Sequence, residues 1–309
     1  MAKKPISFVQ IELTNNCNYN CEKCPRDFDR GKGYMDWDLF VKTIEQCFLY
    51  AGFVNFSFFG EPMLYPRIFD VWEYTKRKPK GMKAVTNSNL SLTTREHFDR
   101  IINHSGISQF RMSIDAATNE TYDIVRPSKN VFDLDGNKHR DNRLDVIDEK
   151  VRYWHSLPNH IATRHVFPVS SLNQHEADAF VKKWKPLLGP NDHILIKKIL
   201  TYGGKIKDSQ LESHPCNVWG LRGLTVDWAG NVSPCNLDTN MDLTCGNINE
   251  QSLIEIIDGP EYNRIKALSM TRNIKPCLTC VDANNWSKNM TITRDKPWDL
   301  ARFKRLYGV

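Results

Sequence analysis

The 309-residue sequence predicts an α/β protein, with a partial (β/α)6 barrel followed by a small C-terminal α+β domain. Two observations predict this fold. Strand-like and helix-like segments alternate from residue 7 to residue 200, which is the pattern of βαβ units and a parallel sheet. After residue 200 the sequence becomes polar and rich in turns, and the alternation stops. We therefore expect a barrel domain over residues 1–205 and a second domain over residues 206–309.

The expected elements of the barrel can be placed one by one. The segment 36–52 has apolar residues at helical spacing, with Asp36 at the N-cap and Gly52 as a C-terminal stop. Six strands are expected, over residues 7–13, 53–59, 82–88, 109–115, 162–169 and 193–200. Five helices are expected between them, over residues 36–52, 65–78, 93–104, 143–157 and 175–188. Six such units fit a partial TIM-like barrel better than a closed eightfold one. A doubly wound open sheet fits the same alternation, but no G-x-G-x-x-G follows the first strand to support a dinucleotide-binding form.

The last third of the chain has a different pattern of predicted elements. Residues 221–235 predict a small hairpin with its turn at 229–231, and residues 252–270 predict helix on both sides of Gly259-Pro260. A tail that contains Trp286 and Trp298 completes the sequence.

Composition excludes several functional classes. Hydrophobic residues make up 40% of the chain and charged residues 25%, and no apolar run approaches the 18 residues of a membrane span. The first residues lack the apolar segment of a signal peptide, so we expect a cytoplasmic location. The net charge of +6 is spread along the chain with no Lys/Arg block, which argues against a nucleic-acid partner. We interpret this net charge as ordinary surface charge. The weaker alternative is that it attracts anionic substrates.

Nine cysteines without an export signal indicate metal binding or chemistry and argue against disulfides. Cys17, Cys21 and Cys24 form C-x3-C-x2-C in the loop after the first strand, where parallel α/β proteins place their sites. A structural zinc usually has a fourth Cys or His nearby, but the next histidine, His97, is expected in mid-helix. A [4Fe–4S] cluster held by three thiolates leaves one iron open for a substrate or cofactor. A fragment of a zinc knuckle is the alternative.

This spacing resembles the signature of the radical S-adenosylmethionine (SAM) enzymes. The resemblance implies that the open iron binds the amino and carboxylate groups of SAM. Reductive cleavage of SAM then yields a 5′-deoxyadenosyl radical, which abstracts a hydrogen atom from the substrate. Further motifs at the ends of later strands are similar to SAM-binding segments of the family, and they imply as SAM contacts Gly60, Glu61, Pro62, Asn87, Ser113, Asp115, Arg126 and Asn173.

The resemblance implies a role for each of these motifs. The Gly60-Glu61-Pro62 segment faces the SAM amino group, Ser113 and Asp115 reach the ribose or carboxylate, and Arg126 pairs with the carboxylate. Asn173 lies near the ligand. Taken singly, the motifs also fit turn chemistry and a helix cap. Their joint occurrence in order, each at the end of a strand, favours the SAM site.

Two positions depart from the family pattern. Ser88 stands where the family has a glycine after Asn87. Lys23 stands where an aromatic residue usually precedes the third cysteine and packs near the adenine, so that Tyr19 or Pro25 would have to substitute.

The second cysteine group comprises Cys216, Cys235, Cys277 and Cys280. Two pairs of cysteines could close a tetrahedral zinc site. The spacing also resembles the C-terminal extension of many radical SAM enzymes, called SPASM with two clusters and twitch with one, and residues 245–257 are similar to its helix entry. No cysteine follows Cys280, so the resemblance implies one auxiliary [4Fe–4S] cluster held by all four thiolates. Its implied role is electron transfer, with a structural role as the alternative.

Two cysteines belong to neither group. Cys47 lies on the apolar face of an expected helix and is expected in the core. Cys245 is either a small buried residue or, as in some radical SAM epimerases, the catalytic donor of a hydrogen atom to a substrate radical. In the second case the net reaction is inversion.

The resemblance implies a radical SAM oxidoreductase or epimerase that acts on a small polar, carbohydrate- or aminocyclitol-like substrate. We expect a flavodoxin- or ferredoxin-type electron donor. The alternatives are a maturase for a peptide or protein side chain and a non-catalytic zinc-binding interaction protein. Peptide-modifying relatives usually carry an N-terminal recognition domain, whereas the barrel here is expected to start near residue 7. Candidates for an acid/base group are residues 127–141, Arg164, His165 and Lys197.

Overall fold

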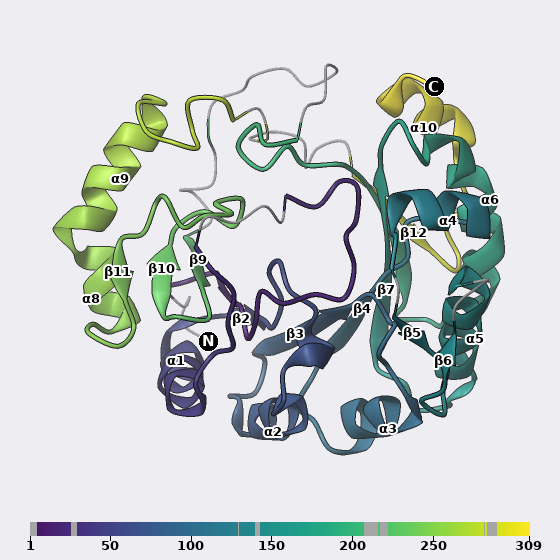
Figure 1. The fold of residues 1–309 in the computed structure, drawn as a ribbon, viewed down its shortest axis with the longest axis horizontal. Coiled ribbons are helices and arrows are strands. Elements are labelled where there is room, and N and C mark those ends of the chain that lie inside the picture. The colour runs from purple at the N-terminus through teal and green to yellow at the C-terminus, as the bar shows by residue number, and fades with distance from the viewer. Residues whose placement is uncertain are drawn as a thin grey trace.

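The computed structural model describes residues 5–25, 30–128, 130–139, 143–206, 216, 222–280, 282 and 289–309. Its centre is a curved ten-stranded sheet with helices on the outer face (Figure 1). The order of strands across the sheet is β11-β10-β9-β1-β2-β3-β4-β7-β8-β12. In chain order these strands are β1 (Phe8–Ile11), β2 (Phe53–Asn55), β3 (Lys83–Ser88), β4 (Gln109–Ser113), β7 (Ala162–Val169), β8 (His193–Lys198), β9 (Gly223–Val226), β10 (Asn231–Ser233), β11 (Gly246–Asn247) and β12 (Met290–Thr293).

The six strands from β1 to β8 in this sheet pair in parallel, as the sequence predicts for a (β/α)6 barrel. β1 pairs on its other side with β9, and β8 pairs with β12. The two edges of the barrel are thus occupied by C-terminal strands and do not meet, so the barrel is partial.

The C-terminal hairpin forms as predicted, from β9 and β10. In its turn Gly230 has a φ of +90°, and the Asp227 carboxylate accepts the backbone N–H groups of Ala229 and Asn231. β9 extends the sheet of the barrel through β1, so the second region shares a sheet with the first. The domain boundary near residue 205 stays a prediction, and residues 207–215 and 217–221 lie outside the described residues.

The helices follow the predicted order. They are α1 (Trp37–Tyr50), α2 (Ile68–Tyr74), α3 (Arg95–Asn103), α4 (Asn119–Val125), α5 (Arg143–Ser156), α6 (Ala177–Trp184), α8 (Leu253–Asp258), α9 (Pro260–Met270) and α10 (Leu300–Tyr307). Asp36 caps α1 as expected, since its side chain accepts the N–H groups of Asp38 and Leu39. Single 3₁₀ turns occur as η1 (Pro62–Leu64), η2 (Thr75–Arg77), η3 (Gln174–Glu176) and η4 (Lys185–Leu187).

Some elements differ from the expected ones. β2 ends at Asn55, although Phe56 still donates its N–H to Val85 O of β3 at 2.9 Å. The chain from Ser57 to Pro62 then leaves the sheet and forms part of the cavity described below. The insert after β4 contains α4 and a hairpin of β5 (Val131–Phe132) and β6 (Lys138–His139). The hydrophobic periodicity of the sequence does not predict these elements. The tail contributes β12 and α10, which the sequence pattern does not predict.

The core lies between the curved sheet and the outer helices. Trp72, Trp154 and Trp184, from α2, α5 and α6, are fully buried there. Cys47 is 0% exposed, which confirms its expected place in the core.

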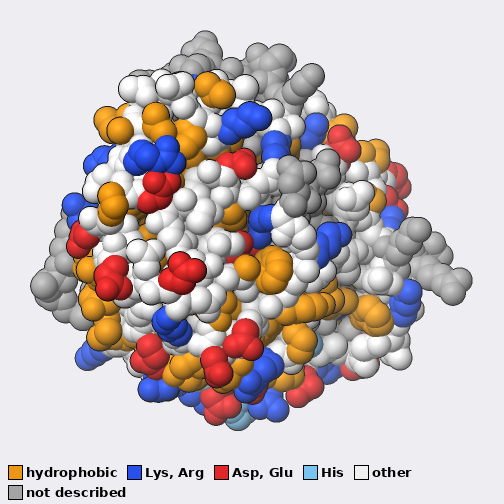
Figure 2. Space-filling view, turned by 60° about the vertical axis from the view of Figure 1, so that its left-hand side comes forward, with side chains coloured by type: hydrophobic (Ala, Val, Ile, Leu, Met, Phe, Trp, Pro, Cys, Tyr) orange, Lys and Arg blue, Asp and Glu red, His pale blue; other side chains and the backbone are white. Residues whose placement is uncertain are grey.

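The surface carries charges of both signs. On the face shown in Figure 2, Lys and Arg side chains are interspersed with Asp and Glu side chains. Within the described residues, no helix combines the length and apolar character needed to cross a bilayer.

Candidate active site

The carboxyl ends of the barrel strands surround a cavity of about 230 Å³. Every residue predicted to hold the first cluster or SAM lines it, although these residues span positions 17 to 173 of the chain. They are Cys17, Cys21, Cys24, Gly60, Glu61, Pro62, Asn87, Ser113, Asp115, Arg126 and Asn173. The structure therefore brings together at one place what the sequence motifs predicted separately.

The three cysteines project from the loop between β1 and α1. The backbone N–H of Tyr19 donates to Cys17 Sγ at 3.5 Å, and Asn89 Nδ2 lies 3.9 Å from the same sulfur. Hydrogen bonds to sulfur stabilise a thiolate and tune iron–sulfur centres. Three sulfur ligands beside a polar cavity fit a cluster that keeps one iron open to a further ligand.

Gly60 allows the cysteine loop and the loop after β2 to approach closely. A Cβ at this position would lie 2.0 Å from the backbone oxygen of Thr14 and 2.9 Å from that of Asn16. The next residue, Glu61, donates its N–H to Asn16 O at 2.9 Å. A glycine is thus required here by the contact between the two loops, whatever it contributes to ligand binding.

We expect Gly60→Ala to destabilise the protein by roughly 1–3 kcal/mol and to weaken SAM binding, because the added methyl group must push the cysteine loop away. Thermal unfolding and equilibrium binding of SAM measure the two effects. Gly52→Ala is the matched control, since a Cβ there would meet only Ser7 O, at 3.4 Å. Equal SAM affinity in the two variants would show that the close approach at Gly60 does not matter.

Glu61 is 3% exposed, and its carboxylate is held by three donors. Ser88 Oγ donates at 2.8 Å and Asn89 N at 2.8 Å, while Met63 N donates at 3.3 Å. Burial raises the pKa of Glu61, and the hydrogen bonds from Asn89 and Ser88 oppose that shift. Ser88, the departure from the family's glycine, thus uses its hydroxyl group to orient this carboxylate.

Asp115 and Arg126 form an ion pair in the cavity wall. Asp115 has a φ of 67°, in the left-handed region that a residue with a side chain rarely adopts. Asn173 holds the backbone there by donating to Asp115 O at 2.8 Å and to Pro168 O at 2.9 Å. Among the described residues, the buried atoms Asp115 Oδ1, Arg126 Nε and Asn87 Oδ1 have no hydrogen-bond partner. Buried polar atoms usually have partners, so these three suit a polar ligand in the cavity.

Aromatic rings complete the wall. Tyr19 lines the cavity, and the Arg126 guanidinium lies 5.4 Å from the centre of its ring. Phe59 and Tyr202 also line the cavity, and their ring centroids are 5.5 Å apart. Of the two predicted substitutes for an aromatic residue at position 23, Tyr19 lines the cavity; Pro25 is buried outside its lining.

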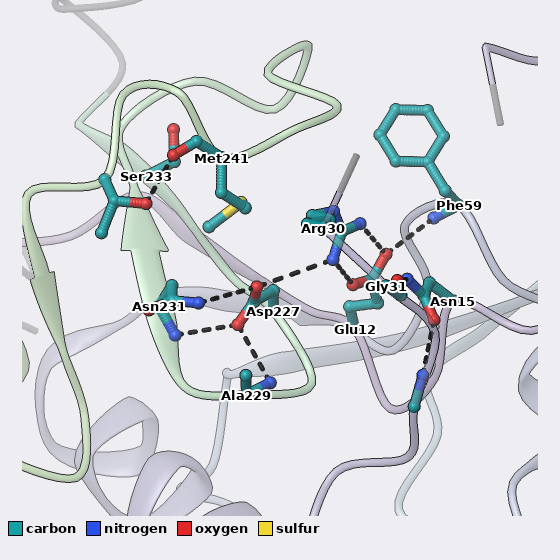
Figure 3. A network of polar contacts seen from close by, with 12 residues as sticks. Glu12, Asn15, Arg30, Gly31, Phe59, Asp227, Ala229, Asn231, Ser233 and Met241 are labelled. Carbon is teal, nitrogen blue, oxygen red and sulfur yellow. Dashed lines mark hydrogen bonds and ion pairs between the residues drawn. The ribbon is translucent and has the colours of Figure 1, made fainter. Parts of the chain in front are cut away.

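A buried polar network connects Glu12, Arg30 and Asp227 (Figure 3). Arg30 donates to both carboxylate oxygens of Glu12, at 2.7 and 2.8 Å, and lies 3.6 Å from Asp227. Glu12 in turn accepts the N–H of Phe59 at 3.4 Å. Asp227 belongs to the β9–β10 hairpin, so this network joins the cysteine loop, the loop after β2 and the C-terminal region. The sequence motifs do not predict this network, although a glutamate at the end of an apolar strand is an available signal.

The second cysteine group lies outside the cavity. Cys235, Cys277 and Cys280 are near enough for their charges to interact, and Cys216 acts on both Cys277 and Cys280. The N–H of Leu237 donates to Cys235 Sγ at 3.4 Å. Burial, and then the neighbouring Cys216 and Cys280, raise the pKa of Cys277 to about 11, so a metal that binds this thiolate must displace its proton. The four side chains thus suit a metal centre.

Cys245 is 5% exposed, and its thiol donates to Val232 O at 3.2 Å. It belongs to the packed core around the β9–β10 hairpin and is not among the described residues that line the cavity. The structure does not place it among the residues predicted to contact SAM, and its catalytic role stays a prediction.

The candidates for an acid/base group differ in whether they line the cavity. Lys197, on β8, lines the cavity, whereas Arg164 and His165 are not among its described lining residues. Arg164 instead donates to His193 Nε2 at 2.6 Å, deeper in the barrel. Burial lowers the pKa of Lys197, an effect that Asp115 opposes and Arg111 reinforces. The described part of the insert 127–141 is also absent from the cavity lining.

Family comparisons agree with this arrangement. Residues 11–152 match the model of the radical SAM superfamily, and residues 216–281 match the SPASM iron–sulfur cluster-binding domain. This chain belongs to the radical SAM superfamily. The predicted recognition of a radical SAM enzyme with a SPASM-type extension is therefore confirmed.

Two curated relatives differ in how much of their length is matched. The tungsten-containing aldehyde ferredoxin oxidoreductase cofactor-modifying protein of Pyrococcus furiosus is 30% identical over 88 residues, which cover 28% of this chain and only 25% of that protein. The S-adenosyl-L-methionine-dependent 2-deoxy-scyllo-inosamine dehydrogenase of Niallia circulans is 22% identical, over 92% of this chain and 95% of that protein.

Solved structures of radical SAM proteins share the fold. BtrN in complex with AdoMet and 2-DOIA superposes with a TM-score of 0.59 at 18% identity, over 96% of this chain and 97% of that chain. Streptococcus suis SuiB bound to the precursor peptide SuiA has a TM-score of 0.64 at 12% identity, over 91% of this chain and 71% of that chain. The two likenesses support the fold of this radical SAM enzyme and leave its substrate to other arguments.

Proposed function

We propose that this radical SAM enzyme is a dehydrogenase or epimerase that removes a hydrogen atom from a small polar, carbohydrate- or aminocyclitol-like alcohol. The observation that carries the proposal is the single cavity that joins three cysteines, the Glu61 loop and Lys197. The substrate class is supported by the match to the 2-deoxy-scyllo-inosamine dehydrogenase over 95% of its length. A flavodoxin- or ferredoxin-type protein is the proposed electron donor.

The donor sets define which groups the two regions would hold. Cys17, Cys21 and Cys24 would bind a [4Fe–4S] cluster with one open iron, and SAM would lie between it and the polar atoms of Asn87, Asp115 and Arg126. When bound, the reduced cluster and SAM together supply a 5′-deoxyadenosyl radical that removes hydrogen from the substrate. A second [4Fe–4S] cluster would be held by Cys216, Cys235, Cys277 and Cys280.

Lys197 is proposed as the proton acceptor. Oxidation of a secondary alcohol to a ketone removes one hydrogen atom, one proton and one electron from the substrate. The hydrogen atom would pass to the 5′-deoxyadenosyl radical, and the electron would pass to the cluster at the second cysteine group. The proton leaves from the hydroxyl oxygen, so it needs a base beside the cavity. Lys197 lines the cavity, and burial lowers its pKa, which brings the neutral amine closer to physiological pH.

Lys197→Met is therefore expected to lower product formation by about 10²–10⁴-fold, the usual contribution of a positioned acid/base group. Release of 5′-deoxyadenosine should continue, because the change leaves the cysteines in place. Lys197→Arg should be as impaired as Lys197→Met, since a guanidinium group stays protonated. Product and 5′-deoxyadenosine are measured together by mass spectrometry. An active arginine variant would show that charge, and not proton transfer, is what matters at this position.

Cys245→Ala distinguishes the two net reactions. If Cys245 donates a hydrogen atom, the variant should stop incorporating deuterium from deuterated water into the product. Its buried position predicts the other result, which is unchanged turnover and labelling with stability lower by about 1 kcal/mol. Unchanged turnover would favour the dehydrogenase over the epimerase.

Substrate identity is tested with the reconstituted enzyme, SAM and a one-electron reductant. The probes are 2-deoxy-scyllo-inosamine, a neutral inositol and a mixture of unmodified peptides, the first two deuterated at the ring carbons. We expect the cyclitols to stimulate 5′-deoxyadenosine release, to transfer deuterium into it and to yield a ketone. Stimulation by the peptides alone would overturn the proposed substrate class and favour the maturase. Zinc in place of iron and sulfide in both cysteine groups would favour the binding protein.

A further inference from the structure

Three histidines gather around Asp192 at the end of the sheet opposite the cavity. His155 lies in the last turn of α5, His160 in the following loop and His165 on β7, while Asp192 directly precedes β8. These are the amino ends of β7 and β8, whereas the cavity lies at their carboxyl ends. The side chains of His155, His160 and Asp192 are 2%, 15% and 1% exposed, and His165 is fully buried.

The ligand atoms of three of these residues converge. His155 Nδ1 lies 3.5 Å from Asp192 Oδ2, and His160 Nε2 lies 3.8 Å from the same oxygen. One ligand atom from each residue falls within 4.8 Å of the other two. In a tetrahedral site with zinc bonds of 2.0–2.1 Å, neighbouring ligand atoms are separated by about 3.4 Å. The separations of 3.5 and 3.8 Å from Asp192 Oδ2 are thus close to those of a zinc site.

The hydrogen bond on the far side of His160 decides which nitrogen carries its proton. Nδ1 lies 3.1 Å from the backbone oxygen of Ile161, which can only accept, so Nδ1 is the N–H donor. In the neutral ring, Nε2 then directs a lone pair toward the carboxylate of Asp192. Two electron-rich atoms face each other across 3.8 Å, an arrangement that a cation between them would stabilise.

His155 has a matching arrangement. Its Nε2 lies 2.8 Å from His165 Nε2, and its Nδ1 is buried without a hydrogen-bond partner among the described residues. If His155 donates from Nε2 to His165, Nδ1 offers a lone pair on the side of Asp192. A histidine that binds a metal usually donates its other N–H to a neighbouring acceptor, and both His155 and His160 have one.

We propose that His155 Nδ1, His160 Nε2 and Asp192 Oδ2 form a binding site for a divalent transition metal, with zinc as the ion that suits two imidazoles and a carboxylate. The site is separate from both cysteine groups and has no sulfur ligand. It fastens the end of α5 and the loop before β7 to the start of β8. Gly189 lies against one side of the site and donates its N–H to Asp192 Oδ2 at 2.8 Å, which orients the carboxylate.

The test uses the full chain with its clusters reconstituted, so that the cysteines are occupied before zinc is added. One equivalent of Zn²⁺ is supplied, loosely held metal is removed with a chelating resin, and bound zinc is measured by mass spectrometry. X-ray absorption at the zinc edge then identifies the ligand atoms. We expect about one zinc per chain, with nitrogen and oxygen neighbours at about 2.0–2.1 Å and no sulfur at about 2.3 Å. Zinc should also raise the thermal unfolding midpoint.

His160→Gln should lose the zinc and its stabilising effect, whereas His104→Gln, at an exposed histidine of the surface, should keep both. Sulfur neighbours in the spectrum of the unmodified chain would overturn the proposal, because they would place the metal at the cysteines. Failure of the unmodified chain to retain zinc would overturn it too. The spectrum of the unmodified chain decides the matter even if the variant fails to fold.

Discussion

Cys17→Ala is expected to bring release of 5′-deoxyadenosine from SAM below detection. One cavity is lined by Cys17, Cys21 and Cys24, which would supply the three protein ligands of the cluster. Loss of one of these thiolates should therefore prevent the cluster from binding. The variant should also hold about four fewer iron atoms per chain after reconstitution, the content of one [4Fe–4S] cluster. Iron, sulfide and 5′-deoxyadenosine are measured on the same sample.

Two matched variants serve as controls for Cys17→Ala. Cys47→Ala changes a fully buried cysteine of the core, so iron content and SAM cleavage should persist with a modest loss of stability. Cys235→Ala should also lose about four iron atoms but continue to release 5′-deoxyadenosine, because Cys235 lies outside the cavity lining of the described chain. If Cys17→Ala keeps its full iron content and activity, the assignment of the first cysteine group is wrong.

The second large effect is expected from the network of Figure 3. Arg30→Met should lower the free energy of unfolding by roughly 3–5 kcal/mol, the cost of leaving a buried charge without its partner. Glu12 is 0% exposed and loses both of its hydrogen bonds from Arg30, while Asp227 loses its nearby cation. Anaerobic urea unfolding of the reconstituted protein measures the change. SAM affinity should fall as well, because Glu12 also accepts the N–H of Phe59, next to Gly60.

The loss should depend on pH in a predictable direction. Burial raises the pKa of Glu12 above its usual value of 4.5, and Arg30 opposes that shift. Without Arg30 the folded state holds the Glu12 proton more tightly than the unfolded chain does. The stability of the variant therefore declines as the pH rises above 4.5, so its deficit should be smaller at pH 5 than at pH 8.

A double variant and a surface variant serve as controls. Adding Glu12→Gln to Arg30→Met should recover much of the lost stability, since the unpaired carboxylate is gone. Arg264→Met breaks an exposed pair with Glu261 and should change stability by less than about 1 kcal/mol. A loss in Arg30→Met that is independent of pH and unaffected by Glu12→Gln would contradict the role given to this network.

Much of the candidate site could be predicted from sequence motifs, because its residues lie at the carboxyl ends of the strands. Cys17, Glu61, Asp115 and Asn173 each follow a strand or lie just beyond one, and parallel strands deliver such loops to one edge of the sheet. The order of strands and helices could also be predicted, because alternation of apolar segments is a local property. The bounds of β2 could not, since Phe58 and Phe59 are as apolar as residues of a strand yet line the cavity.

The amino-acid sequence by itself determined the parallel α/β barrel, the two cysteine groups and membership of the radical SAM superfamily. The reason is that cysteine spacing and hydrophobic periodicity are properties of short segments of the sequence. The tertiary structure alone decided that Lys197 lines the cavity, that Cys245 does not, that Arg30 links Glu12 to Asp227, and that β9 and β12 occupy the two edges of the barrel. These facts depend on contacts between residues up to about two hundred positions apart. Such contacts form only when the sheet curves and the C-terminal strands pair with both of its edges.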